Sequence, residues 1–391
     1  MFRMLRNNAN VHRCSYFELG LPVLPRRHAQ LGFVVFFEMA SVVNFLQQRS
    51  RVFLSKCRRV QLLSGRKVST GRIHSDFQCR LAESTDFDAV VKLSEGLYNG
   101  YDFLPVVYHK WLKKENVAMM LLYAGKSLIG LQAGCIVDEG KTLVWRAARV
   151  AHNLEGQGLQ RKLAVKLGEH VQAKFPEVSR IRTATHLEIQ RKSRNSFEKI
   201  LERDELSFFV EEKSARKFDR LNFRTSLRTE DEFQVQSCTK EYFAKIMLSS
   251  SVITELCPNN ILVFDWCPYE PLRSNVDLIL KEDHNTHFFA EKNCVEASPK
   301  SFSYGVHAKT VETVKWEASV YSDDPAIFQA HLLYQFKRAC EIIDSKFTFF
   351  SVQDRALTGY ARKILGEMLQ LKEANLLKGT TMKVFERPFT H

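Results

Sequence analysis

Residues 143–174 read LVWRAARVAHNLEGQGLQRKLAVKLGEHVQAK and carry the strongest structural signal in the chain. The run 142–150 has the length and apolar content of a strand, and apolar residues recur at helical spacing through 159–174. Gly156 and Gly158 separate the two patterns. The order therefore predicts a strand, a glycine turn and a helix.

The glycine turn could bind an anion, or it could serve only as a connection between the strand and the helix. A Gly-x-Gly loop between a strand end and a helix start exposes backbone N–H groups at the positive end of the helix dipole, which suits a pyrophosphate. Arg161, Lys162 and Lys166 could add positive charge in the same helix. The alternative is an ordinary strand-to-helix turn that happens to use glycine.

Regular patterns extend on both sides of this stretch. Upstream we expect a strand at 77–82, a helix opened by a Thr85/Asp88 capping box, a helix at 105–114, and strands at 117–123 and 128–137. Downstream we expect a strand at 178–184, a helix at 190–202, a strand at 206–211 and a polar linker at 212–235. Strands at 313–321, 347–352 and 382–386, with helices at 325–343 and 355–369, then repeat the layout without a phosphate loop. The predicted class is α/β (α+β), a mixed central sheet flanked by helices.

Length and charge divide the chain unevenly. It has 391 residues and a net charge of +13, but residues 1–75 hold 13 Lys and Arg against only Glu18 and Glu38. We therefore expect a basic tail at 1–75, a first domain at 76–225 and a related second domain at 226–391. The Arg-rich, acid-poor composition of the tail is typical of an organellar transit peptide. The alternatives are a disordered basic arm and an extension without function. We expect an intracellular protein, cytoplasmic or alternatively mitochondrial.

Several classes of protein are disfavoured. The apolar run 31–46 is only 16 residues long with Glu38 at its centre, so we expect no transmembrane segment. The nine cysteines are widely spaced without a C-x-x-C pair, which favours a reducing compartment, and no histidine spacing indicates a metal. Nucleic-acid binding ranks lowest, because the body beyond residue 75 is nearly neutral.

Three motifs carry a resemblance to a known family. They are Leu93–Leu112 (LSEGLYNGYDFLPVVYHKWL), Arg149-Val150-Ala151 leading into the glycine turn, and 265–271 (DWCPYEP) followed by Ser274-Asn275. On these residues the chain resembles the GNAT superfamily of acetyl-CoA-dependent N-acetyltransferases, and more narrowly the histidine N-acetyltransferase group. The resemblance covers about residues 78–388. It implies a GNAT-like fold with a second GNAT-like domain in tandem.

The resemblance also implies a site. Acetyl-CoA is the expected co-substrate, held by Ala148, Arg149, Val150, Gly156, Gln157, Gly158, Leu159 and Gln160. A small-molecule amine or amino acid, histidine-like by resemblance, is expected to meet Tyr98, Asp102, Tyr108, His109, Asp265 and Tyr269. No catalytic residue is assigned. His109 could titrate near neutral pH, or it could simply pack beside Trp111.

This sequence departs from the family pattern at three positions. Glu155 and Gln160 stand at the ends of the phosphate loop, where relatives carry Arg or Gln and Gly or Ala, and Arg146 stands where relatives often carry a general-base Glu. The helix after the next strand often supplies a Tyr as general acid in relatives, whereas Asn195-Ser196-Phe197 offers no hydroxyl beyond Ser196. Two hypotheses follow: an acetyl-CoA-dependent N-acetyltransferase acting on an amino-acid α-amine, or a GNAT-like binding or regulatory module with impaired catalysis.

Overall fold

The computed structural model describes residues 77–187, 189, 196–212, 235–281, 285–292, 299–311, 313–374, 376 and 381–389. The tail predicted at 1–75, the domain boundary predicted at 225 and the linker residues 213–234 lie outside the described residues. Among the described helices, none is long and apolar enough to cross a membrane.

The first half contains a meander of antiparallel strands followed by a long helix and a parallel strand. In order, its elements are β1 (Phe77–Leu81), α2 (Phe87–Leu93), α3 (Leu104–Leu112), β2 (Val117–Ala124), β3 (Ser127–Val137), β4 (Thr142–Val150), α4 (Leu159–Lys174) and β5 (Arg180–Thr185). Gly125 makes the β2–β3 turn with a φ of 59°, a conformation that glycine adopts readily. The predicted strand, glycine turn and helix at 142–174 are confirmed.

The capping box predicted at the first helix is wrong by two residues. A 3-10 turn, Ser84–Asp86, precedes α2, and Glu83 and Asp86 make the reciprocal bonds instead of Thr85 and Asp88. Asp86 also pairs with Arg80 at 2.5 Å, which ties this turn to β1. The capping box lies at the start of this 3-10 turn and not at the start of α2, which explains the shift of two residues.

The helix predicted over 190–202 is wrong wherever the structure describes it. Residues Glu198–Val210 form one 13-residue strand, β6. Glu198 and Lys199 at the start of this strand are exposed, whereas Arg203 and Asp204 further along it are buried and hydrogen-bonded. Arg203 donates to the carbonyl of Val320 at 2.6 Å, and Asp204 accepts from the hydroxyl of Thr358 at 2.8 Å.

The second half adds further strands, and helices on both faces of the sheet. Its elements are β7 (Val235–Ser237), α6 (Lys240–Leu248), α7 (Ser250–Leu256), β8 (Leu262–Phe264), β9 (Cys267–Tyr269), α8 (Arg273–Lys281), β10 (Thr286–Glu291), β11 (Phe302–Lys309), β12 (Val314–Tyr321), α9 (Pro325–Ile342), β13 (Phe347–Gln353), α10 (Thr358–Arg362), β14 (Lys372–Glu373) and β15 (Thr381–Pro388). Asp324 caps α9 by accepting from the N–H of Ala326 at 2.7 Å, and Pro325 occupies the first turn. The strands and helices predicted from 313 onward are confirmed.

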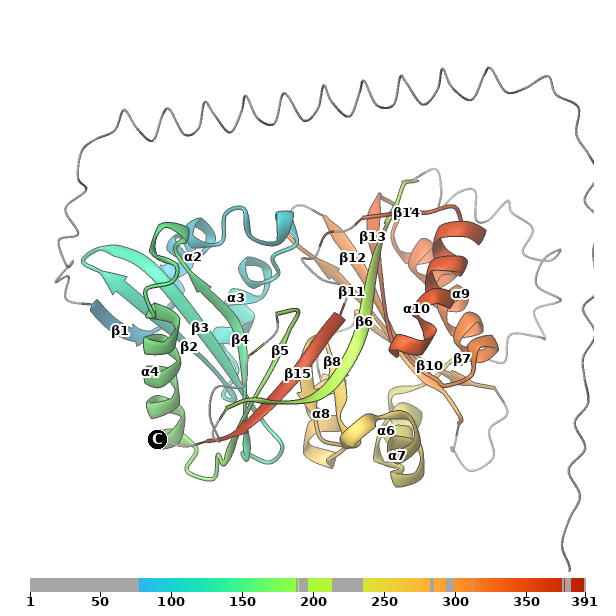
Figure 1. The fold of residues 1–391 in the computed structure, drawn as a ribbon, viewed down its shortest axis with the longest axis horizontal. Helices are drawn as coiled ribbons and strands as arrows, with labels where there is room; N and C mark the ends of the chain where they lie inside the picture. The colour runs from blue at the N-terminus through green and yellow to red at the C-terminus, as the bar shows by residue number, and fades with distance from the viewer. Residues whose placement is uncertain are drawn as a thin grey trace, which may run out of the picture. The chain divides into compact units, whose positions relative to one another are not determined.

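The two halves share one continuous sheet. Its strand order is β1-β2-β3-β4-β5-β15-β6-β13-β12-β11-β10-β7, with β14 pairing β6 off this path. The last strand of the chain, β15, therefore lies between two strands of the first half and is antiparallel to both (Figure 1). Beyond β15, β6 pairs with β13 of the second half from Asp204 to Val210. The result is a mixed α/β sheet in which each half depends on the other.

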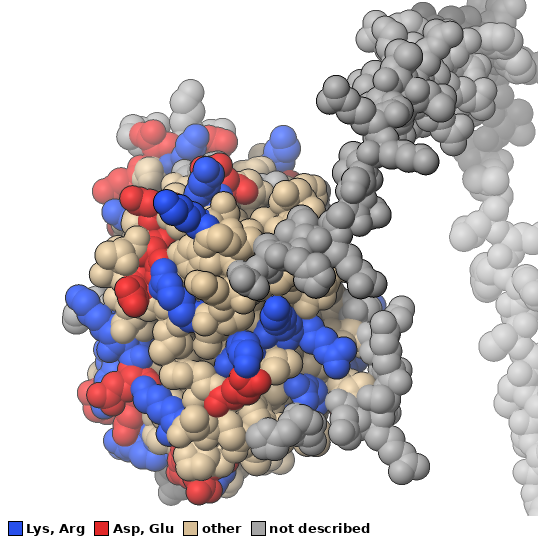
Figure 2. All heavy atoms as spheres, turned by 90° about the vertical axis from the view of Figure 1, so that its left-hand side faces the viewer, with Lys and Arg blue, Asp and Glu red and all other residues tan. Residues whose placement is uncertain are grey.

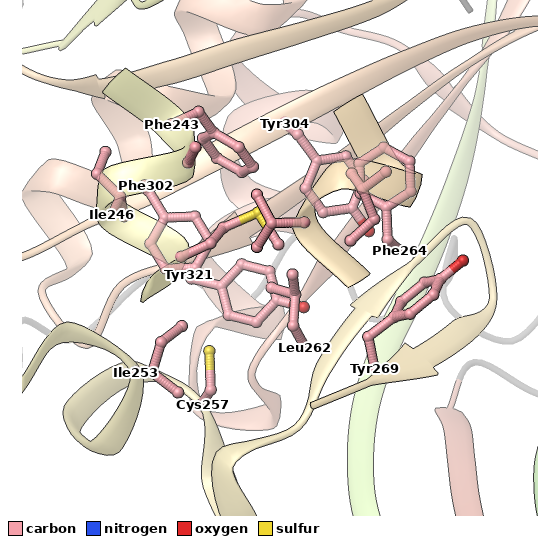
Figure 3. Packing of buried hydrophobic residues seen from close by; sticks show 14 of the residues in the cluster. Phe243, Ile246, Ile253, Cys257, Leu262, Phe264, Tyr269, Phe302, Tyr304 and Tyr321 are labelled. Atoms are coloured by element: carbon pink, nitrogen blue, oxygen red, sulfur yellow. The ribbon is translucent and has the colours of Figure 1, made fainter. Parts of the chain in front are cut away.

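Aromatic residues fill the core beneath the β8–β9 ribbon, as Figure 3 shows. Phe302 and Tyr321 stack with ring centroids 4.7 Å apart, and Phe243 stacks on Phe288 at 4.1 Å. A separate apolar cluster around Phe336 joins α9 to the other face of β12 and β13. Both faces of the sheet in the second half are thus covered, and β13 is buried at every position.

A buried ion network joins the halves. Arg182 on β5 contacts Asp138 at 2.6 Å, Glu386 of β15 at 2.6 Å and Glu270 after β9 at 2.9 Å. Asn275 of α8 donates to the second oxygen of Asp138 at 2.6 Å. The side chains of Arg182 and Asp138 are only 2% and 0% exposed, so each depends on the other for its charge.

A buried histidine makes the stability of the fold sensitive to acid. Both ring nitrogens of His331 bond serine hydroxyls, Ser301 at 2.9 Å and Ser303 at 2.8 Å, and burial lowers its pKa to about 3. Below pH 6.5 an unfolded histidine binds a proton that the folded one excludes. The free energy of unfolding therefore falls as the pH is lowered from 6.5 to 3, and His331 accounts for about 1.4 kcal/mol of this fall per pH unit. His331→Gln should remove that contribution.

Urea unfolding at pH 7, 6, 5 and 4 measures this slope. The absolute stability of the variant is not the readout, because Gln also alters packing. His109→Gln, at an exposed site, serves as the control and should keep the wild-type slope. An unchanged slope in His331→Gln would contradict the assignment.

Candidate functional site

Strands β4 and β5 separate part-way along their length. They pair in parallel from Thr142 to Trp145, opposite Arg180 to Thr183, and the pairing stops there. At the same point β4 bulges against β3, where Ala147 has a φ of 50°. The β5-facing edge of 146–150, which includes the predicted Ala148 and Val150, therefore carries no sheet pairing. Its backbone polar groups are available to a bound molecule.

The glycine turn lies beyond this opening. Gly156 and Gly158 have φ values of 77° and 75°, and a side-chain carbon at either position would meet no atom within 4 Å. Gln157 and Gln160 are exposed, whereas Leu159 packs into the core and can offer only its backbone. No side chain caps α4 at Gly158. The first N–H groups of α4 therefore face open space, as an anion site requires.

Glu155, the acidic residue in this turn, has a histidine as its neighbour. Glu155 lies 3.3 Å from Nδ1 of His152, and both side chains are exposed. Lys162 of α4 lies over the ring of Phe77 at 4.8 Å. On the face that carries α4 and β1, Lys and Arg are interspersed with Asp and Glu (Figure 2). The turn can therefore hold a phosphate by its backbone despite the departures at Glu155 and Gln160.

Arg149 and Asp102, predicted to contact different ligands, contact each other. Their side chains are 2% and 1% exposed and 2.6 Å apart. Arg149 also donates to the hydroxyl of Ser94, and Asp102 accepts from the N–H of Leu104 at the start of α3. The pair fixes the segment between α2 and α3 against β4. Only the backbone of Arg149 faces the β4–β5 opening.

Of the other predicted residues of this segment, Tyr108 and His109 contact each other, with ring centroids 5.4 Å apart. Tyr108 is buried and donates to the carbonyl of Glu83 at 2.6 Å, and burial raises its pKa. His109 is exposed, with its ring 4.7 Å from that of Phe87. Tyr98 is 51% exposed and has a φ of 51°. These three side chains do not line the cleft described next, and their roles stay predictions.

A narrow cleft of about 80 Å³, partly open to solvent, lies between the first half and the β8–β9 ribbon. Its lining combines apolar residues of α3 with residues of β2, β3, β4 and the ribbon: Phe103, Val107, Lys110, Trp111, Lys114, Asn116, Val117, Gly134, Cys135, Arg146, Phe264, Asp265, Tyr269 and Leu278. It brings together the predicted Asp265 and Tyr269. Three cations, Lys110, Lys114 and Arg146, face one carboxylate.

The turn between β8 and β9 closes one wall of the cleft. Asp265 and Trp266 both have left-handed backbones, with φ values of 45° and 61°. Arg146 donates to the carbonyl oxygen of Asp265 at 2.7 Å and lies over the ring of Trp111 at 5.0 Å. Strained two-residue turns of this kind persist where the surroundings hold them, often at functional sites. Arg146 therefore anchors this turn to the wall of the cleft that Trp111 forms.

A buried ionisable cluster that no local motif predicted lies beside this turn. His186, one residue beyond β5, contacts Trp266 edge to face with centroids 4.6 Å apart. Its Nε2 atom lies 3.5 Å from Oε2 of Glu205 on β6. Lys315 of β12 pairs with Glu317 at 2.9 Å and lies 3.9 Å from Asp265. Its members come from separate strands, and the only hint in the sequence was the charged run at 201–205.

No group of three or more metal-ligating side chains occurs within the described ranges. The arrangement instead offers hydrogen-bond donors for an anion at the glycine turn, a backbone edge at the β4–β5 opening, and a charged cleft. Together these features suit the transfer of a group from a long phosphorylated carrier to a small molecule.

The family model for the C-terminal part of histidine N-acetyltransferases matches residues 231–354. The chain is 28% identical to the histidine N-acetyltransferase of Scomber australasicus over 236 residues, covering 59% of this chain and 70% of that one. For the histidine N-acetyltransferase of Oreochromis niloticus the identity is 23% over 270 residues, covering 67% and 79%.

Solved structures agree on the fold. A tandem GNAT protein from the clavulanic acid biosynthesis pathway superimposes with a TM-score of 0.50 over 81% of this chain and 99% of that one, at 7% identity. At that identity the likeness concerns the fold alone. The chain is therefore similar in sequence to histidine N-acetyltransferases, and its fold is similar to that of a tandem GNAT protein.

Proposed function

We propose that the protein transfers the acetyl group of acetyl-CoA to the α-amine of a small amino acid, with histidine as the leading candidate. The observation that carries this proposal is the cleft beside the β4–β5 opening, whose lining holds three cations and one carboxylate. The similar proteins named histidine N-acetyltransferase support the same assignment.

Acetyl-CoA fits the residues on the donor side. The open N–H groups at Gly158 and the start of α4 would hold its pyrophosphate, and the unpaired edge of 146–150 would hold the pantetheine arm. When bound, acetyl-CoA supplies the thioester that carries the acetyl group. The chain's own contribution is to position the amine, exclude water and accept its proton.

The acceptor side favours a carboxylate. Burial, followed by the neighbouring charges of Lys110 and Arg146, lowers the pKa of Lys114. An anion in the cleft would relieve this crowding of like charge. The α-carboxylate of an amino acid supplies such an anion, and the aromatic side chains of Phe103 and Trp111 offer an apolar wall for its side chain.

The test is acetyl transfer by the purified full chain from labelled acetyl-CoA to histidine, histidine methyl ester and histamine. Histidine should be acetylated, and the two acceptors without a carboxylate should lose at least tenfold in kcat/KM. Equal rates for all three would contradict the carboxylate assignment. If no amino acid in a wider panel were acetylated, the impaired binding module would become the better description.

The glycine turn gives a direct test of the donor side. Gly158→Asn should weaken the thermal stabilisation by coenzyme A at least tenfold in ligand concentration, since the asparagine side chain would occupy the space of the phosphates and could bond the free N–H groups of α4. Asparagine tolerates the left-handed backbone better than other side chains do.

Gly125→Asn is the matched control, because Gly125 has a similar φ of 59° and equally open surroundings in the β2–β3 turn. Both variants should unfold at similar temperatures without ligand, and only Gly158→Asn should lose the response to coenzyme A. A normal response in Gly158→Asn would place the pyrophosphate elsewhere.

A further inference from the structure

Two buried hydrogen-bonding atoms face each other without partners beside the cleft. They are Nε2 of His186 and Oε2 of Glu205, 3.5 Å apart, and neither has a hydrogen-bond partner in the structure. The side chains are 13% and 2% exposed. Buried polar atoms are rarely left unpaired, and at 3.5 Å these two are too far apart for a normal hydrogen bond to each other.

The orientation of His186 is fixed by its other nitrogen. Nδ1 lies 3.1 Å from the carbonyl oxygen of Thr381 on β15. A carbonyl can only accept, so Nδ1 carries the proton and Nε2 presents a lone pair. Burial, followed by the charge of Lys383, lowers the pKa of His186, which keeps the imidazole neutral at physiological pH. Trp266 packs against the ring at 4.6 Å.

The carboxyl group opposite His186 belongs to Glu205, and its environment favours the neutral form. Burial and the nearby carboxylate of Glu317 raise the pKa of Glu205 to about 8, while Lys315 opposes this shift. An incoming cation would favour the ionised form. An ammonium group has several N–H donors on one small atom, so it could bond Nε2 and Oε2 together.

The pair also lies where the reaction needs it. His186 follows β5 directly, three residues beyond Thr183, where the pairing with β4 stops. Asp265 lines the cleft, and its neighbour Trp266 covers His186. Through Trp266, His186 thus lies next to a wall of the cleft, and it follows the strand whose pairing with β4 ends at Thr183.

We propose that the gap between His186 and Glu205 binds the acceptor's amine nitrogen, and that His186 is the general base. This inference rests on the proposed function. The nitrogen enters as an ammonium group with three protons and leaves as an amide with one. Nε2 takes the first proton, which frees the lone pair that bonds to the acetyl carbon as the C–S bond breaks. Of the two protons lost, one leaves with the thiol of coenzyme A and the other goes to solvent.

His186→Gln tests the base. In the full chain, kcat for histidine should fall at least 100-fold, and the acid limb of its pH profile should disappear, while stabilisation by coenzyme A is kept. The matched control is His307→Gln, because His307 on β11 is half-buried and its pKa is also lowered by burial. That variant should stay within twofold of wild type. A kcat within threefold of wild type in His186→Gln overturns the proposal.

Glu205→Gln, an isosteric change, tests whether the carboxylate of Glu205 binds the acceptor's amine nitrogen. In wild type, KM for the acceptor should fall between pH 6.5 and 8.5 as Glu205 ionises. In the variant, KM should be at least tenfold higher at pH 8.5 and this pH dependence should be absent. If the pH dependence of KM is unchanged in Glu205→Gln, the binding of the amine by Glu205 is contradicted. This holds even if His186→Gln does not fold. If both variants match an active wild type, only this inference fails, whereas a wild type without acetyl transfer overturns the proposed function too.

Discussion

A chain ending at residue 380 is expected not to fold into the described body. The truncation removes β15 from the middle of the sheet, where it pairs with β5 on one side and β6 on the other. Val384 and Phe385, 0% and 2% exposed, would no longer fill the core. Two long strand edges would be left unpaired inside the molecule, each with backbone groups that require partners.

Circular dichroism and urea unfolding measure the result. The truncated chain should show no cooperative transition and should aggregate on expression. A chain ending at residue 389 keeps β15 and the bond from the N–H of Phe389 to the carbonyl of Ser179, so it should unfold like the full chain. Cooperative unfolding of the shorter chain with near-normal stability would show that β5 and β6 can pair without β15.

Arg182→Met is expected to lower the free energy of unfolding by about 3–5 kcal/mol. The substitution keeps much of the side-chain volume but leaves Asp138 buried without its main counter-charge, and it also removes the partner of Glu386. Arg180 lies 3.6 Å from Asp138 and compensates only in part. The effect is large because the oxygens of Asp138 cannot reach water.

Urea unfolding of three variants isolates the cause. Arg273→Met removes an exposed pair with Asp277 and should cost less than about 1 kcal/mol. Combining Arg182→Met with Asp138→Asn should recover part of the lost stability, since the unpaired charge is gone. Additive losses in the double variant would mean that packing, not charge, explains the effect.

Local patterns predicted most of the elements but not their partners. The meander β2–β4, α4 and the elements from β12 onward follow from apolar spacing, glycine turns and a proline start. The position of β15 could not be predicted, because alternation marks a strand without naming its neighbours. The helix predicted at 190–202 was wrong because the partners that hold β6 as a strand, such as Val320 and Thr358, are more than a hundred residues away.

The site was predictable to the same extent. The motif around Asp265 and Tyr269 led to two residues that line one cleft. Arg149 and Asp102 were assigned to different ligands because the sequence cannot reveal that they form an ion pair. His186 and Glu205 belong to no local motif, and only the sheet brings them together.

The place of β15 also affects how the protein is made. A ribosome releases β5 and β6 well before β15, which lies nearly two hundred residues later in the chain. Until the last strand emerges, the growing polypeptide exposes two edges able to pair with foreign strands. Folding of the sheet thus awaits the synthesis of β15. Chaperone demand and slow, concentration-sensitive refolding are the expected costs.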